Sequence, residues 1–270
     1  MAINLSTLRR VKNDRPPIIC VHGGPGIGKT TFAASSEDCV FIRTEDGLGV
    51  LEVDAFPIST SFDEVMEAIS SLASEEHNFK WLVLDSLSAL EPLIWAAVAK
   101  DEGKKNVEDI PYGKAYVIAL DRWREMLDAL AYLAAEKKVG SILIAHSDIV
   151  RHEPPEMAAY DRTQIKLHKR AFQLVYERAD IIGYAAPEVF LSKDGDPKSL
   201  KGARNIATGS GQRWLHLVEK PAFIAKNRYQ LPEKLPLSWA DFHAELMARL
   251  AAPTGQAGQS DTTEPAAKAA

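Results

Sequence analysis

A glycine-rich stretch near the start of the chain has the residue types and spacing to hold a phosphate. The residues from Gly23 to Thr30, GGPGIGKT, match the pattern G-x-x-x-x-G-K-[ST]. In this pattern backbone N–H groups turn toward phosphate oxygens, the lysine reaches the β- and γ-phosphates, and the hydroxyl ligates Mg²⁺. An apolar run precedes the loop and TTFAAS can begin a helix, so we predict binding of ATP with Mg²⁺ rather than a chance match. The predicted nucleotide-binding residues are Gly23, Gly24, Pro25, Gly26, Ile27, Gly28, Lys29, Thr30 and Thr31.

Three other polar residues stand at or just past the ends of short apolar runs. Asp85 ends WLVLD, and we predict that it holds Mg²⁺ together with Thr30; the alternative is a helix cap. Glu45 follows CVFIRT, and we predict that it is the general base that orients the attacking water. The alternative is that it belongs to an acidic surface turn. His146 ends SILIAH, where it would sense the γ-phosphate or play a structural part. Glu45, His146 and Lys29 belong to the predicted catalytic set, which two late cations, Lys226 and Arg228, complete.

The elements that must position these residues alternate between strand and helix. Short apolar runs from Pro17 to His22, Cys39 to Thr44, Trp81 to Ser86 and Ser141 to His146 are typical of strands buried in a parallel sheet. Helical periodicity follows Ser61 and runs again from about Tyr112 to Lys138. This order predicts a mostly parallel, doubly wound α/β core with right-handed crossovers.

The second half of the chain has a different pattern of predicted elements. We predict a loop over 147–162, a basic amphipathic helix over 163–179, and strands at DIIGYAAPEVFLS, RNIAT and RWLHLVE around a flexible tip, KDGDPKSLKG. These strands form a C-terminal antiparallel extension, and a helix capped by Ser238 closes the fold. We expect one domain over 1–250. The last stretch, 251–270, lacks Leu, Ile, Val and aromatic residues and is predicted to be a disordered tail.

Composition limits the function classes. The chain has 270 residues, 46% of them hydrophobic, which is enough for one sizeable core. No apolar run approaches the roughly 18 to 20 residues of a spanning helix, and Met1 to Arg15 lacks a signal-peptide core, so we expect a cytoplasmic protein without membrane contact. Cys20 and Cys39 have no metal-ligand spacing, which argues against zinc and disulfides. The net charge of −5 leaves room only for a local basic groove.

A set of segments links the chain to a known group of proteins. In order, they are GGPGIGKTTFA, RTEDGLGVL, WLVLDSLSAL, DIPYGKAY, ILIAHS, YDRTQIKLHKRA, ADIIGYA and AKNRYQLPEKLPL. With them the chain resembles, from about Ile18 to Leu250, phage ATP-binding proteins with a RecA-like core, including Sak-type single-strand annealing proteins. The resemblance implies a RecA-like AAA-type P-loop ATPase that acts on single-stranded DNA in phage recombination or replication. It also implies a homo-oligomeric ring or filament with ATP at subunit interfaces, and a single-strand binding protein as a further partner. The N-terminal polymerisation domain of RecA is not expected, since the first strand begins near Pro17.

The resemblance also gives a role to two late cations. In RecA-like motors a basic residue late in one core reaches the γ-phosphate held by its neighbour, and Lys226 and Arg228 occupy the matching position. Alternate strand residues point the same way, and an arginine fork suits phosphate oxygens. The alternative is an ordinary solvated strand rim.

RecA-like cores place DNA-facing segments after the fourth and later strands. Tyr160 could stack on a base in this part of the chain. The alternative is that the helix cations form one solvated face. The predicted DNA-binding cations are Arg151, Arg162, Lys166, Lys169, Arg170, Lys198, Lys201 and Arg204, with Lys193 in the same loops.

Two other functions remain open at this point. The first is a regulatory ATP-binding switch or helicase-loader-like protein that holds a protein partner. The second is a P-loop kinase, against which Glu45 and the Lys226–Arg228 segment argue, because a kinase needs no water-orienting base.

Overall fold

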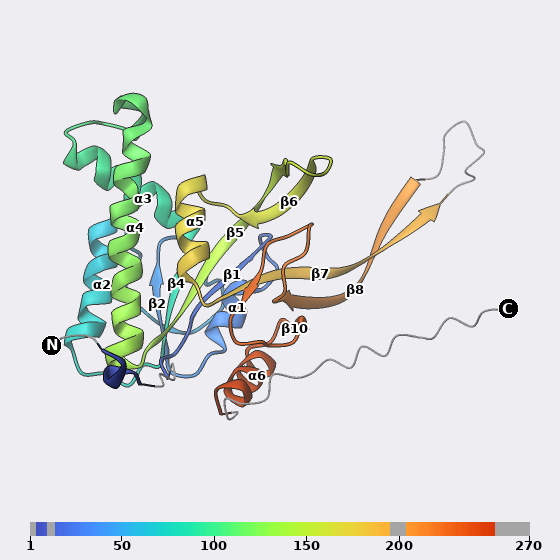
Figure 1. Cartoon of the computed structure of the whole chain (residues 1–270), viewed down its shortest axis with the longest axis horizontal. Helices are drawn as coiled ribbons and strands as arrows, with labels where there is room; N and C mark the ends of the chain where they lie inside the picture. Colours follow the sequence, from blue (N-terminus) through green and yellow to red (C-terminus); the bar gives the residue numbers. More distant parts are fainter. Residues whose placement is uncertain (1–3, 10–13, 195–203, 252–270) are drawn as a thin grey trace.

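The computed structural model describes residues 4–9, 14–194 and 204–251, and a ten-stranded sheet forms its centre. The strands follow the order β10-β8-β7-β1-β5-β4-β2-β3, with β6 paired to β5 and β9 paired to β7 (Figure 1). The pairs among β1, β2, β3, β4, β5 and β7 are parallel, whereas the later strands pair antiparallel. The strands are β1 (Ile18–Gly23), β2 (Cys39–Arg43), β3 (Asp54–Ala55), β4 (Trp81–Asp85), β5 (Gly140–His152), β6 (Tyr160–Ile165), β7 (Ile181–Asp194), β8 (Arg204–His216), β9 (Lys226–Asn227) and β10 (Lys234–Pro236).

Helices cover both faces of the sheet. The buried strand residues alternate between two apolar clusters, with Ile18 and Cys20 on one face and Ile19 and Val21 on the other. The first cluster includes residues of α2 to α5, and the second includes residues of α1 and α6. The helices are α1 (Lys29–Ala34), α2 (Phe62–Ser74), α3 (Leu87–Asp101), α4 (Lys114–Tyr132), α5 (Lys169–Arg178) and α6 (Trp239–Ala251), and a π-helical turn, Leu133–Lys137, continues α4. The predicted fold class, a RecA-like core with an antiparallel C-terminal extension, is confirmed.

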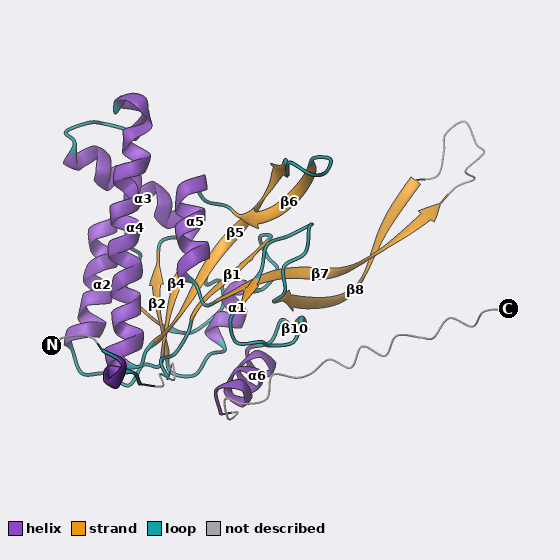
Figure 2. Ribbon diagram, in the orientation of Figure 1, coloured by secondary structure: helices purple, strands orange, loops and turns teal. Residues whose placement is uncertain are grey.

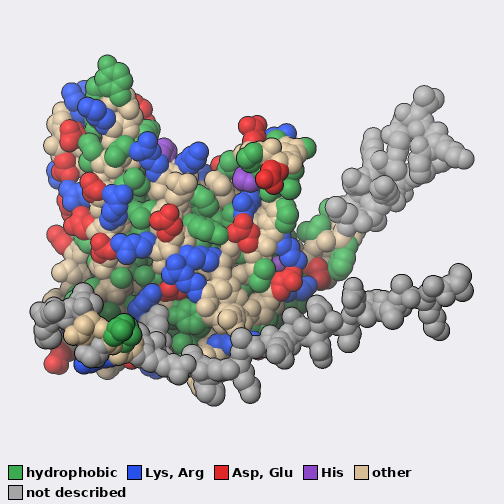
Figure 3. All heavy atoms as spheres, in the orientation of Figure 1, with side chains coloured by type: hydrophobic (Ala, Val, Ile, Leu, Met, Phe, Trp, Pro, Cys, Tyr) green, Lys and Arg blue, Asp and Glu red, His purple; other side chains and the backbone are tan. Residues whose placement is uncertain are grey.

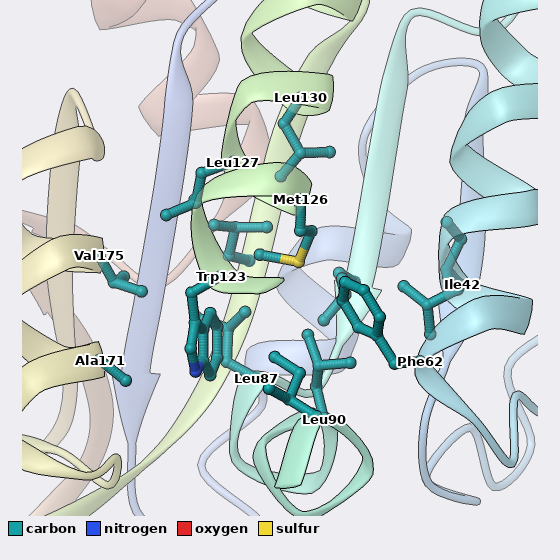
Figure 4. Close-up of a cluster of buried hydrophobic side chains, with 14 of the residues drawn as sticks. Ile42, Phe62, Leu87, Leu90, Trp123, Met126, Leu127, Leu130, Ala171 and Val175 are labelled. Atoms are coloured by element: carbon teal, nitrogen blue, oxygen red, sulfur yellow. The ribbon is translucent and has the colours of Figure 1, made fainter. Parts of the chain in front are cut away.

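The centre of the helical layer is built around α4. Trp123, Met126, Leu127 and Leu130 recur at helical spacing and are buried between α3 and α5 (Figure 4). Each buried methylene group stabilises the fold by about 0.8 kcal/mol, so this row anchors α4 firmly.

The sheet brings the predicted chemistry to one edge. β5 lies between β1 and β4, and the register pairs Gly23 with His146 and Asp85 with Ile144. β2 adjoins β4 with Arg43 opposite Asp85, which carries the chain into Glu45. Because these strands are parallel, their carboxyl ends meet at the same edge.

Three sequence expectations about the second half are wrong. The predicted loop over 147–162 is largely a hairpin, because β5 continues to His152 and pairs with β6. Ile149 and Val150 are exposed on this two-stranded ribbon, which has no buried face to produce a strand pattern (Figure 2). The predicted helix over 163–179 begins only at Lys169, since residues up to Ile165 belong to β6. RNIAT and RWLHLVE belong to a single strand, β8, up to His216.

Other expectations are confirmed or lie outside the described residues. The Ser61 and Ser238 hydroxyls accept backbone N–H bonds from Glu64 and Asp241 and so cap α2 and α6. The helix expected from Tyr112 begins at Lys114. The tip residues 195–203 and the tail beyond Ala251 lie outside the described ranges, so the tail stays a prediction.

Glu91 on α3 is a carboxyl group whose ionisation the fold opposes. Its side chain is 7% exposed, and its two oxygens accept the His168 N–H at 2.9 and 3.0 Å. Burial raises the pKa of Glu91 to about 7. The folded protein therefore holds this proton more tightly than the unfolded chain. The stabilising contribution is complete below the unfolded-state pKa and is lost as the pH rises through about 7.

We expect Glu91→Gln to remove this loss, because an amide keeps the shape and one acceptor but cannot ionise. At about pH 8 the variant should be more stable than wild type by about 1 to 3 kcal/mol, whereas at about pH 5 the difference should shrink. Urea unfolding across pH measures both free energies. Glu102→Gln, which neutralises an exposed carboxylate at the end of the same helix, is the matched control. If the free energy of unfolding depends on pH in the same way for wild type and Glu91→Gln, the prediction is wrong.

Candidate active site

The loop between β1 and α1 has the shape that its glycines predict. Gly26 and Gly28 have φ angles of 71° and 106°, in the left-handed region that other residues rarely adopt. Gly28 also caps α1 and lies so close to β8 that an added Cβ would stand 2.7 Å from Arg213 Nη1. A larger residue at Gly28 would strain the backbone and collide with this guanidinium.

Lys29 is held at the mouth of this loop. The side chain is buried, and Nζ donates to the carbonyl oxygens of Gly23 and Gly24 at 3.0 and 2.8 Å. Burial lowers the pKa of Lys29, while the charges of Asp85 and Glu45 act in the opposite direction. Because this ammonium group is removed from water, an anionic ligand stabilises its charged form strongly.

Thr30 and Asp85 form a pair of oxygen donors beside Lys29. The Thr30 hydroxyl donates to Asp85 Oδ2 at 2.8 Å. Asp85 is buried, and burial raises the pKa of its carboxyl group, while the Thr30 bond acts in the opposite direction. Hydroxyl and carboxylate oxygens are ligands that Mg²⁺ prefers, so the pair fits this ion together with phosphate oxygens. Mg²⁺ bound there would neutralise charge on the phosphates. The described residues contain no cluster of three or more His, Cys, Asp or Glu that would hold a metal without such a partner.

Glu45 and His146 meet on the other side of the same mouth. His146 Nε2 lies 3.4 Å from Glu45 Oε1, and both side chains are about one-third exposed, at 32% and 37%. Thr44 fixes the backbone next to Glu45. Its N–H donates to the Asp85 carbonyl, and its hydroxyl donates to the Ser86 carbonyl and accepts the Ser86 N–H. The carboxylate is therefore accessible to water and held in place by its neighbour.

These side chains line one cavity of about 460 Å³. Its walls are the loop from Pro25 to Thr31, the strand-end residues Asp85, Ile144 and His146, and a second loop from Glu45 to Leu51. Val50 in that second loop is 99% exposed. Thr44 and the loop beyond Glu45 belong to the quoted segment RTEDGLGVL, but only Glu45 was predicted as a site residue. The Gly47 and Gly49 spacing was the available signal for a close approach to a ligand.

A second groove, of about 320 Å³, continues from the loop on its α1 side. Gly28, Thr31 and Ser35 form one wall, and Arg213 and Leu237 form the other. Arg213 Nη1 donates to the Ile27 carbonyl at 3.1 Å. Arg213 was not predicted as a site residue, because nothing local distinguishes one exposed arginine on a long strand.

Lys226 and Arg228 lie at the opposite edge of the sheet. β9 pairs with Ile181 and Ile182, at the amino end of β7. Lys226 Nζ donates to the Glu177 carbonyl at 3.0 Å and also to that of Tyr176, at the carboxyl end of α5. Arg228 donates to the Glu177 carbonyl and forms an ion pair with Asp180 at 3.2 Å. The two cations therefore have partners within the chain and stand apart from the cavity.

The predicted DNA-binding cations fall into distinct groups. Lys166, Lys169 and Arg170 are exposed around the start of α5 and take part in no ion pair with the described residues. Arg151 instead pairs with Asp161 at 3.4 Å, and Arg162 pairs with Glu219. Lys193 and Arg204 lie near the ends of β7 and β8, whereas Lys198 and Lys201 lie outside the described residues. Tyr160 contacts the His152 ring edge-on.

Comparison with known proteins identifies the family. The chain matches the AAA domain family over residues 15–229, well over half of its length. The chain belongs to this AAA domain family. The matched region contains the phosphate-binding loop and the mostly parallel sheet that carries it. The region that matches the family begins just before β1 and ends just after β9, so this region contains every residue that lines the cavity.

Other comparisons add less. The AAA domain is similar to a solved structure described as the RadB recombinase, with 17% identity, a TM-score of 0.42, and coverage of 78% of this chain and 86% of that chain. No curated protein matches it. Among the described residues, no helix has the length and apolar character needed to cross a bilayer.

Proposed function

We propose that this AAA domain hydrolyses ATP and acts on single-stranded DNA, in phage recombination, annealing or replication. The observation that carries the proposal is the convergence of Lys29, the Thr30–Asp85 pair and the Glu45–His146 pair on one cavity. The loop shape suits phosphates, and an accessible carboxylate at the same mouth suits activation of water.

Each residue has a distinct part in the proposed reaction. Lys29 binds the β- and γ-phosphates and compensates their charge, and Thr30 and Asp85 hold Mg²⁺. Glu45 orients a water molecule and accepts its proton as the water oxygen attacks the γ-phosphorus and ADP leaves. His146, in contact with Glu45, senses the γ-phosphate. The groove beside Arg213 is open to the nucleoside part of the same ligand.

The RecA-like resemblance implies an assembly with ATP at subunit interfaces. In such an assembly Val50, which is 99% exposed in the cavity wall, would lie near a neighbouring copy of the chain. We propose that subunits join as a ring or filament in this way.

One observation favours the alternative of an ATP-dependent switch with a protein partner. Two of the predicted DNA-binding cations, Arg151 and Arg162, are already paired with carboxylates. The net charge is −5, so DNA binding depends on the few cations that remain exposed.

The start of α5 therefore provides the test of DNA binding. Replacing Lys166, Lys169 and Arg170 together with Ala should weaken binding of a labelled oligonucleotide about tenfold or more and lower the salt slope by about 2, since three phosphate contacts are lost. Fluorescence anisotropy with an ATP analogue, over a range of salt concentrations, measures both quantities.

The matched control removes the same charge from the opposite edge of the sheet. Lys80, Lys137 and Lys138 precede β4 and β5, and Lys80 and Lys138 pair with Asp38 and Asp14. Replacing Lys80 and Lys137 with Ala and Lys138, whose φ is 59°, with Asn should leave affinity for the oligonucleotide nearly unchanged. Both triple variants should bind ATP like wild type. If wild type binds no oligonucleotide while it hydrolyses ATP, the protein-switch function replaces the DNA function.

A further inference from the structure

Ser88, in the first turn of α3, joins two segments that are distant in sequence. Its hydroxyl accepts the backbone N–H of His146 at 3.1 Å and donates to the Lys166 carbonyl at 3.1 Å. Between the same two segments, the Lys166 N–H donates to the His146 carbonyl at 2.8 Å. The end of β5 at the cavity is thus tied to the segment that leads into α5.

Glu91 makes a parallel attachment one turn further along α3. Residues three apart on a helix share a face, so Ser88 and Glu91 point to the same neighbours. Glu91 accepts the His168 N–H, the residue that caps α5. The Tyr116 ring from α4 stacks on the His168 ring, with centroids 4.4 Å apart and planes 9° apart. The residues 166–168 are therefore held on several sides.

The other end of this connection is the nucleotide cavity. α3 follows Asp85 after a single residue, Ser86, whose hydroxyl caps the helix at Ala89. His146 contacts Glu45 across the cavity mouth. A displacement of the His146 backbone therefore moves a group that Ser88 contacts directly, and a displacement of Asp85 acts on the start of the helix that carries Ser88.

The exposed cations lie in and directly after the attached segment. Lys166 is bonded to Ser88 through its own carbonyl, and Lys169 and Arg170 begin α5. Figure 3 shows Lys and Arg side chains in the hollow between the α3–α4 part of the molecule and the β5–β6 hairpin. The position of these charges depends on backbone that is bonded to α3.

We propose that Ser88 and Glu91 are positioning residues that couple the phosphate-sensing end of β5 to the basic start of α5. The coupling rests on the proposed function, in which His146 responds to the γ-phosphate and the basic segment binds DNA. Binding of ATP shifts the His146 backbone, and the two side chains carry the shift to residues 166–170. Reciprocally, DNA on that segment changes the affinity for ATP by the same factor.

Amide hydrogen exchange tests the coupling without requiring DNA or hydrolysis. The amides of His146, Lys166 and His168 are the donors in these bonds, so their exchange reports the connection directly. In wild type, an ATP analogue should slow exchange both in the loop before α1 and in residues 166–170. In Ser88→Ala and in Glu91→Met, slowing in the loop should persist while the response of 166–170 is lost.

Conservative variants separate positioning from general damage. Ser88→Thr keeps the hydroxyl and Glu91→Gln keeps one acceptor, so both should retain the response of 166–170. Ser74→Ala removes a hydroxyl that bonds only within α2 and is the matched control. A second readout is the ratio of oligonucleotide affinities with the ATP analogue and with ADP. We expect Ser88→Ala and Glu91→Met to reduce this ratio about three- to tenfold.

The outcomes distinguish this inference from the proposed function. If the analogue fails to protect the loop before α1 in wild type, ATP binding itself fails and the inference fails with it. If the loop is protected but residues 166–170 do not respond, the proposed site stands and the coupling is wrong. A response of 166–170 that survives in both Ser88→Ala and Glu91→Met also overturns the inference, because another route then carries the signal.

Discussion

Replacing Glu45 with Gln is expected to leave ATP bound and to slow its hydrolysis about a hundredfold or more. Glutamine preserves the size of the side chain and can still accept a bond from His146, so the cavity should keep its shape. It cannot accept the proton that the attacking water must lose. The loss therefore falls on the chemical step rather than on nucleotide affinity.

Lys29→Ala provides the contrasting result. It removes the ammonium group at the mouth of the loop, so both ATP affinity and hydrolysis should fall while the fold survives. Nucleotide binding measured by a fluorescent analogue, together with single-turnover hydrolysis, separates the two variants. Asp46→Asn neutralises the adjacent carboxylate in the same cavity wall and is the matched control, with near wild-type turnover. Wild-type turnover by Glu45→Gln would assign the base to another group.

The convergence at the cavity could be predicted from sequence, because it depends on a general property of parallel sheets. Short apolar runs identified β1, β2, β4 and β5, and polar residues at their carboxyl ends had to meet. The shape of the phosphate-binding loop could also be predicted, because it depends only on the left-handed backbone conformation of Gly26 and Gly28 themselves. Local patterns therefore placed Lys29, Asp85 and His146 together.

Features that depend on distant partners were not available from sequence. Arg213 donates a hydrogen bond to the carbonyl of Ile27, which is 186 residues away in the sequence, and no sequence pattern predicts this contact. The β5–β6 hairpin has no buried face, so its residues resemble a loop in composition. The links from Ser88 and Glu91 to residues 166–168 likewise appear only when α3 packs against the segment that precedes α5.

Lys226 and Arg228 differ in their local partners, and this difference bears on the predicted role in trans. The Lys226 ammonium caps α5 through two carbonyls and lies 5.3 Å above the Tyr176 ring, and burial lowers its pKa. Arg228 is half exposed, and Asp180 keeps a second ion pair, with Arg15 at 2.9 Å, when Arg228 departs. Arg228 is therefore the better candidate to leave its position and act on a neighbour.

Arg228→Ala is expected to preserve ATP affinity and to reduce turnover by a factor on the order of 10³. A role in hydrolysis would be in trans, because β9 pairs level with Ile19 and Cys20 of the sheet, and the loop begins four residues beyond Ile19, about 13 Å away at 3.3 Å per residue. Arg228→Lys keeps the charge without the planar fork and should recover only part of the turnover. Steady-state hydrolysis at saturating ATP measures the series.

Mixing two inactive variants gives the decisive measurement. A Lys29→Ala subunit still offers Arg228, and an Arg228→Ala subunit still offers an intact loop. In a head-to-tail assembly of equal parts, about a quarter of the junctions join a good loop to a good arginine, so about that share of wild-type activity should return. Activity that stays absent while mixed assemblies form, as shown by light scattering, would place Arg228 in a structural role. Its bonds to Glu177 and Asp180 would then be the whole of its function, and Arg228→Ala should lower the melting temperature instead.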